Sequence, residues 1–237
     1  MKPWRVAVSC CAFLAAGCVV QGETCEINTS QISMHATAID GDRGIAVEIE
    51  LEEGDMTGVA TSLELCAEQD ERIEVNDRAA ELREIFGVFR YVVTFDEPQE
   101  SYRIEFERPG RGQEIVAEVV APAQFQIDGP ASDETISRRV PVPITWSPAG
   151  AAEDLLEIEL ERRDVLCLDA WSVETEDDGE FTVPAGALVA SDPMGPPTCE
   201  AEYVITRRTE GSYPAELSPG GEIEAFVKRK LRFTSIP

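Results

Sequence analysis

Most of the chain after residue 30 alternates between apolar and acidic side chains with a period of two. Residues 45–52, 102–107 and 156–161 show the alternation most clearly. It places apolar residues on one face and mostly acids on the other, as in half-buried antiparallel strands. Residues 78–86 fit either a short helix or a further strand. Between the runs lie glycine, proline and aspartate residues typical of turns, at 40–44, 53–55, 108–112, 177–179 and 219–221.

This pattern predicts an all-β protein made of antiparallel β-sandwiches. The roughly 220 residues that follow the first 17 could form one large sandwich or two of ordinary size. We expect two in tandem, because the Ala121-Pro122 step interrupts the strand ladder between two apolar runs. The expected domains are residues 30–121 and 122–237, and residues 18–29 are expected to form a short tether.

The second half of the chain carries a more specific pattern. Residues 140–148 read Val-Pro-Val-Pro-Ile-Thr-Trp-Ser-Pro, and residues 178–188 read as a later hairpin. Together they resemble the Ig-like and fibronectin-type-III-like domains of bacterial surface proteins over residues 122–190. The resemblance implies that Trp146 fills the core between the two sheets. It supports a fold, and this fold serves many unrelated functions.

The N-terminus has the layout of an export signal. Lys2 and Arg5 precede an apolar stretch, residues 6–17, which is too short to cross a bilayer as a helix. The stretch ends in Leu14-Ala-Ala-Gly-Cys18, which resembles the bacterial lipobox, although Ala15 is less typical there than leucine or valine. An ordinary signal peptide cleaved near Gly22 is the alternative.

The lipobox resemblance implies that residues 1–17 are removed and that Cys18 carries a lipid. Two or three acyl chains would anchor the protein stably, whereas a single chain anchors only marginally. The next residue is Val19 rather than aspartate. By resemblance to lipoproteins of Gram-negative bacteria, this favours the outer membrane over the inner membrane.

The chain is strongly acidic, with a formal charge of −26 that becomes −28 when the first 17 residues are removed. Such a surface repels phosphate backbones and anionic lipid surfaces, so we expect no nucleic-acid partner. The hydrophobic content of 43% is sufficient for a folded core. The acids are therefore interpreted as the solvent-facing sides of the sheets.

The chain has seven cysteines, and Cys10 and Cys11 would be removed with residues 1–17. Four cysteines then remain besides Cys18, and an even number is typical of an oxidising compartment. Four cysteines allow three pairings, and two domains favour one bridge in each: Cys25–Cys66 and Cys167–Cys199. We expect no zinc site, because the sequence contains no CxxC pair and only one histidine, His35.

Residues with the right chemistry for catalysis or metal binding are few or unspecific. His35 is the only candidate for a catalytic imidazole, and it is interpreted as a partly exposed strand residue. Residues 40–42 and 176–178 place acids in turns and could hold calcium, but Asp-Gly is also an ordinary hairpin pair. We therefore expect no catalytic residue, no metal and no cofactor.

The only basic run is Lys228, Arg229, Lys230 and Arg232. It is either a docking stripe for an acidic partner or a set of charges that pair with glutamate-rich strands and protect a sheet edge. The second interpretation is favoured.

These observations predict that the protein is a non-catalytic lipoprotein of the bacterial cell envelope, bound to the membrane through Cys18. We expect a protein-binding, glycan-binding or structural surface module. An extracytoplasmic hydrolase on an all-β scaffold is the alternative.

Overall fold

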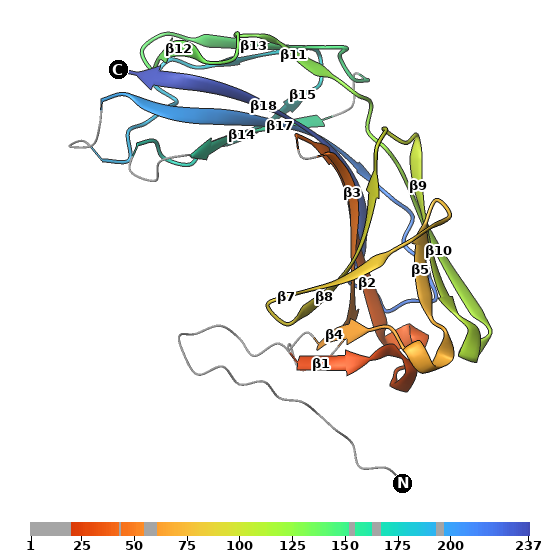
Figure 1. Ribbon diagram of the computed structural model, residues 1–237. Coiled ribbons are helices and arrows are strands. Elements are labelled where there is room, and N and C mark those ends of the chain that lie inside the picture. Colours follow the sequence, from red (N-terminus) through yellow and green to blue (C-terminus); the bar gives the residue numbers. More distant parts are fainter. Residues whose placement is uncertain (1–19, 43, 55–60, 152–154, 163–166, 193–196) are drawn as a thin grey trace. The chain divides into compact units, whose positions relative to one another are not determined.

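The computed structural model describes residues 20–42, 44–54, 61–151, 155–162, 167–192 and 197–237. The regular secondary structure of this part of the chain is almost entirely strands packed as sandwich-like sheets, which confirms the all-β prediction (Figure 1). No helix among these residues is long and apolar enough to cross a membrane. The chain divides into two compact units, and each is described by itself.

The first unit holds residues up to Ile39, then Gly44–Ala121 and Thr209–Ala225. Its strands and short 3-10 turns are β1 (Val20–Glu23), η1 (Thr24–Glu26), η2 (Thr29–Gln31), β2 (Ile32–Gly41), β3 (Gly44–Glu53), β4 (Thr61–Glu64), η3 (Ala67–Gln69), β5 (Arg72–Val75), β6 (Arg78–Ala79), β7 (Glu81–Ile85), β8 (Val88–Phe95), β9 (Ser101–Arg108), η4 (Pro109–Arg111) and β10 (Gln113–Val120).

Two sheets enclose the core of the first unit. In one, β3 lies between β2 and the strands β4 and β8, and in the other the order is β10-β9-β5-β6. The core is built from the inward positions of the alternating strands, including Val47, Ile49, Ile104 and Phe106, all fully buried. The alternation over residues 45–52 and 102–107 is thus confirmed. In the range 78–86, Arg78–Ala79 and Glu81–Ile85 form strands rather than a helix.

The second unit holds Asp40–Arg43, Pro122–Arg208 and Phe226–Pro237. Its strands are β11 (Gln126–Gly129), β12 (Glu134–Ser137), β13 (Val142–Ser147), β14 (Leu155–Arg162), β15 (Ser172–Glu176), β16 (Glu180–Val183), β17 (Cys199–Glu210) and β18 (Glu222–Ile236). One sheet has the order β18-β17-β14-β15 with β12 added beside β18, and the other is β11-β13-β16. Trp146 is 2% exposed in the core, as the resemblance implied.

The chain passes between the units more than once. β17 and β18 each contribute residues to both, and so does β2. Residues 209–225 join the first unit because Leu217, Ile223 and Ala225 are buried in its core. A single cut after Ala121 therefore does not describe the division, although Ala121 and Pro122 do belong to different units.

Candidate functional site

The segment that follows the predicted lipid-attachment site is held in the first unit by strand pairing and by hydrogen bonds from buried side chains. Cys18 itself lies outside the described residues. Two residues later β1 begins, and it pairs in parallel with β4, from Val20 opposite Thr61 to Glu23 opposite Glu64. The structure differs here from the tether expected over residues 18–29, because the described part of that range is a strand followed by two turns.

A buried arginine holds these turns in place. The Arg108 side chain is fully buried, and its Nε donates a hydrogen bond to Glu71 Oε1 at 2.8 Å. The rest of the guanidinium donates to Thr29 Oγ1 at 2.7 Å, to the Ile27 carbonyl at 3.2 Å and to the Thr24 carbonyl. The turns would otherwise leave buried carbonyl groups without donors, which is costly. Arg108 thus satisfies the backbone of the incoming segment.

The second oxygen of the Glu71 carboxylate joins this segment to the loop after β4. Glu71 Oε2 accepts hydrogen bonds from the Thr24 hydroxyl and from the Cys66 backbone amide, the latter at 3.3 Å. The Cys66 amide also donates to Thr24 Oγ1 at 3.0 Å. This shared set of bonds fixes Thr24 against Cys66, and so it brings the neighbouring Cys25 beside Cys66.

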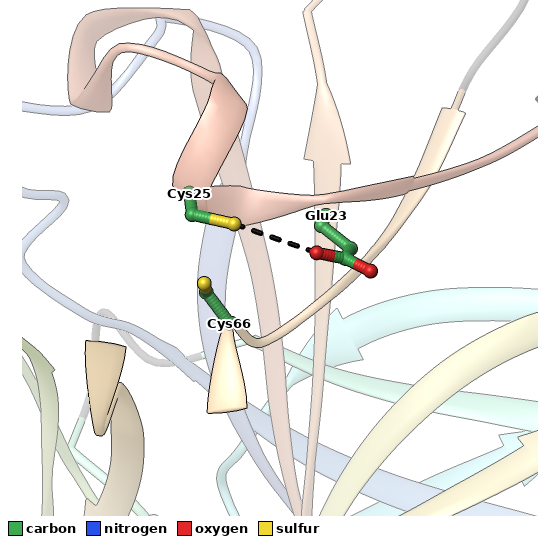
Figure 2. Close-up of side chains that lie close together, drawn as sticks. All are labelled: Glu23, Cys25 and Cys66. Carbon is green, nitrogen blue, oxygen red and sulfur yellow. Dashed lines mark hydrogen bonds between the residues drawn. The ribbon is translucent and has the colours of Figure 1, made fainter. Parts of the chain in front are cut away.

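Cys25 and Cys66 are free thiols in the structure, although the sequence predicted a bridge between them. Figure 2 shows their side chains with that of Glu23, whose Oε2 accepts a hydrogen bond from Cys25 Sγ at 3.4 Å. The possible ligand atoms of the three residues lie within 4.8 Å of one another. The thiols are therefore neighbours, as a bridge would require, but no sulfur–sulfur bond joins them.

The surroundings keep the Cys25 thiol protonated. Burial raises its pKa to about 12, with further contributions from its hydrogen bonds to Cys66 and Glu23. A protonated thiol is a poor nucleophile and a poor metal ligand. Glu23, Cys25 and Cys66 could hold a thiophilic metal ion only after losing protons. The same two thiols could form a disulfide if an oxidant removed two electrons and two protons.

The other predicted bridge is present in the second unit. Cys167 and Cys199 form a disulfide with their Cα atoms 6.1 Å apart. It links the residues after β14 to the first residue of β17, and both cysteines are buried.

The second unit also has a buried arginine, paired with Asp177. Arg207 Nε donates to Asp177 Oδ2 at 2.5 Å, and Trp146 Nε1 donates to Asp177 Oδ1 at 2.6 Å. The guanidinium also donates to the carbonyls of Ala123 and Gln124, at 3.0 and 3.3 Å. Burial alone would raise the pKa of Asp177, but the hydrogen bonds from Arg207, Trp146 and the Gly150 amide together lower it.

The two acidic turns considered for calcium already use several of their oxygens. The Asp177 carboxylate accepts hydrogen bonds from Arg207 and Trp146. Asp178 Oδ1 accepts a hydrogen bond from the Glu180 amide in its own turn. In the other turn, Asp40 Oδ1 accepts from Arg229 and Oδ2 accepts from Gln124. These acids act as structural acceptors.

The basic run follows the charge-pairing part of its interpretation, but β18 has neighbouring strands on both sides in the sheet order, so the run does not protect a sheet edge. Lys230 Nζ donates to Glu161 and, at 2.7 Å, to Glu202 Oε1, and these bonds raise the pKa of Lys230. Arg232 Nε lies 3.6 Å from Glu202 Oε2. Lys228 Nζ lies 5.1 Å from the centre of the Phe226 ring. Lys230 and Arg232 thus neutralise acids on β14 and β17 of the second unit.

His35 lies on β2 with a partly exposed side chain, as the sequence predicted. Its nitrogens lie 3.8 Å from Glu52 and 3.7 Å from Glu222, so its contacts are with surface carboxylates of the same unit. A further trio of carboxylates, Glu74, Glu105 and Glu107, lies close together on β5 and β9. Arg72 and Arg103 form ion pairs with these acids.

Sequence reasoning missed Arg108, Glu71 and Arg207. A signal was available for the two arginines, because each continues the inward-facing positions of its strand. Arg108 follows Ile104 and Phe106 in steps of two, and Arg207 follows Tyr203 and Ile205. A charged side chain at an inward position requires a buried partner. Glu71 follows a short turn and carries no comparable signal.

No protein-family model matches this chain, and no curated protein sequence matches it.

Proposed function

We propose that the protein is a lipoprotein of the bacterial cell envelope, anchored through Cys18 and located at the outer membrane. The observation that carries the proposal is the sequence of residues 14–18, which places a cysteine after small residues at the end of an export signal. The Cys167–Cys199 disulfide is consistent with an oxidising compartment.

The fold that follows supports a non-catalytic role for the anchored module. The buried guanidinium groups of the two units, Arg108 and Arg207, are occupied in binding carboxylates and the protein's own backbone. We infer that the two units present sheet surfaces and loops to a protein or glycan partner, or act as a structural spacer. The acidic strand faces keep these surfaces soluble.

A hydrolase, the alternative from the sequence, would have to use His35. That imidazole is paired with glutamates on the first unit. The depression found on the second unit is lined by Asp133, Glu200, Ala201, Arg232, Phe233 and Thr234, so it does not involve the histidine. These observations favour the non-catalytic proposal.

Membrane fractionation of Cys18→Ser tests the anchor. Cys10→Ser is the matched control, because it changes a cysteine that the predicted cleavage removes. We expect Cys18→Ser to leave the membrane fraction and Cys10→Ser to remain there with the natural chain. Equal membrane retention of all three proteins would overturn the proposal.

A further inference from the structure

The turn that joins β7 and β8 presents a bulky apolar side chain to solvent. Phe86 is 99% exposed, while Leu82 and Ile85 on the same hairpin are 44% and 42% exposed. Single exposed apolar residues are common on protein surfaces. Three of them within five residues, ending in a fully exposed phenylalanine, form an apolar tip that the described fold leaves uncovered.

The backbone of this turn is unfavourable for phenylalanine. Phe86 has a φ of +52° and Gly87 a φ of +85°. Two-residue hairpin turns with both φ values positive prefer Asn, Asp or Gly. The neighbouring β5–β6 turn follows this preference, with Asn76 and Asp77 at +47° and +61°. A large side chain in the left-handed region is a true outlier, and such outliers cluster at functional sites.

The position of the tip indicates what it contacts. Gln21 Nε2 on β1 donates hydrogen bonds to the Gly87 carbonyl at 3.1 Å and to Glu84 Oε1 at 3.2 Å, so the turn lies against β1 (Figure 1). Gln21 is three residues after Cys18. A fully extended chain spans at most about 3.6 Å per residue, so the chain from Gln21 to Cys18 can reach no farther than roughly 11 Å.

We propose that the β7–β8 tip, with Phe86 at its end, inserts into the lipid bilayer that holds the Cys18 anchor. This inference rests on the proposed function, since the anchor brings the bilayer to within reach of the tip. An aromatic and two aliphatic side chains suit the boundary between headgroups and acyl chains. Among the exposed charges of β7, Arg83 is paired with Glu81 at 3.9 Å, and the carboxylate of Glu84 favours zwitterionic over anionic headgroups.

The inserted tip would give the lipoprotein a second contact with the membrane. An acyl anchor alone leaves the protein free to pivot about Cys18. A second contact on the same unit restricts that rotation, and the two contacts act at high effective concentration because one chain joins them. The module would therefore face its partner in a defined orientation.

Photocrosslinking of the full-length chain tests the contact. The protein is expressed with p-benzoylphenylalanine in place of Phe86 and is purified with its lipid anchor. It is then reconstituted in vesicles of phosphatidylethanolamine and phosphatidylcholine and irradiated. Because the side chain at position 86 is almost fully exposed, the substitution should leave the fold unchanged, which the melting temperature checks. We expect phospholipid adducts on the peptide that contains position 86.

The matched control carries the same probe in place of Val120, another exposed apolar residue of the first unit. Val120 ends β10, whose first residue, Gln113, accepts a hydrogen bond from Thr29 in the N-terminal segment. The other end of an eight-residue strand is about 23 Å away. We expect position 120 to give at least tenfold fewer lipid adducts than position 86.

The outcomes separate this inference from the proposed function. Adducts to phospholipid at position 86 support it. Two results overturn the membrane contact when the N-terminal peptide of the same sample carries lipid on Cys18. One is adducts to a second copy or to another protein, and the other is equal yields of lipid adducts at positions 86 and 120. An N-terminal peptide without lipid overturns the proposed function, and the membrane contact with it.

Discussion

The two units satisfy the buried backbone carbonyls of their entering segments in the same way. In each, a buried arginine pairs with one carboxylate and donates to backbone carbonyls of the segment that enters the unit. Arg108 serves residues 24–27 in the first unit, and Arg207 serves residues 123–124 in the second. Arginine suits this task because its rigid fork of five donors reaches several carbonyls at once.

The units differ in what else holds them. The second has the Cys167–Cys199 disulfide and a tryptophan that shares the acid of its arginine pair. In the first, the comparable cysteines are free thiols, so the described part of the entry segment is held to β4 and its loop by non-covalent contacts. Because no disulfide holds its entry segment, the first unit should depend more heavily on its arginine.

The largest expected effect comes from Arg108→Met. It leaves the Glu71 carboxylate buried and unpaired, and removing one partner of a buried ion pair typically costs about 3–5 kcal/mol. Urea unfolding measures the loss in free energy of unfolding. The control is Arg72→Met, because Arg72 is half-exposed and its ion pair with Glu107 should contribute less than about 1 kcal/mol. Similar losses in both variants would contradict the role given to Arg108.

Removal of each cysteine pair tests whether the disulfide makes the two units differ in stability. Replacing Cys167 and Cys199 by alanine should lower the free energy of unfolding by about 2–5 kcal/mol, because a covalent link is lost. The same change at Cys25 and Cys66 should cost about 1 kcal/mol, the scale of a small core truncation. Thermal unfolding of both double variants measures the difference. Equal losses would indicate that Cys25 and Cys66 are bonded too.

Asp177→Asn should cost about 1.5–3 kcal/mol, since it removes a charged acceptor of two buried donors. It should also change the pH dependence. The pKa of Asp177 is lowered in the folded state, so its stabilising effect is present above the unfolded pKa of about 3.9 and is lost as the pH falls through the folded value.

The free energy of unfolding, measured from pH 7 down to acid, should therefore fall less steeply for Asp177→Asn than for the natural chain. Trp146 fluorescence reports the change locally, because its indole donates to this carboxylate. Parallel acid profiles for the two proteins would contradict the assignment.

The smallest effect concerns the rate at which Cys25 is alkylated. With a pKa of about 12, its reaction with iodoacetamide should still be accelerating above pH 10. Glu23→Gln removes a hydrogen-bonded carboxylate and should shift that rise to lower pH. Peptide mapping after alkylation measures the rate at this residue alone. A plateau near pH 9 in the natural chain would rule out the environment described here.

The sequence predicted those features that depend on local pattern. Alternation with a period of two identified the strands around Val47, Ile104 and Ile158, because one face of each packs against a core. The Cys167–Cys199 pairing followed from the expectation of two domains. The expectation of a tether over residues 18–29 did not include β1 and the two turns after it, because these turns depend on hydrogen bonds to Glu71 and Arg108, which are far away in sequence.

The return of residues 209–225 to the first unit escaped prediction for a similar reason. Their apolar positions indicate burial but carry no information about which core receives them. The exposed turn at Phe86 lies in a range that fitted a strand or a helix equally well. Only the backbone conformation and the contact with Gln21 distinguish it from an ordinary apolar residue.

Mass measurement of the N-terminal peptide from membrane-purified protein shows whether Cys18 is the anchor. We expect the peptide to begin at Cys18 and to carry the mass of a diacylglyceryl group, with residues 1–17 absent. An unmodified peptide that begins downstream, for example at Glu23, would contradict it.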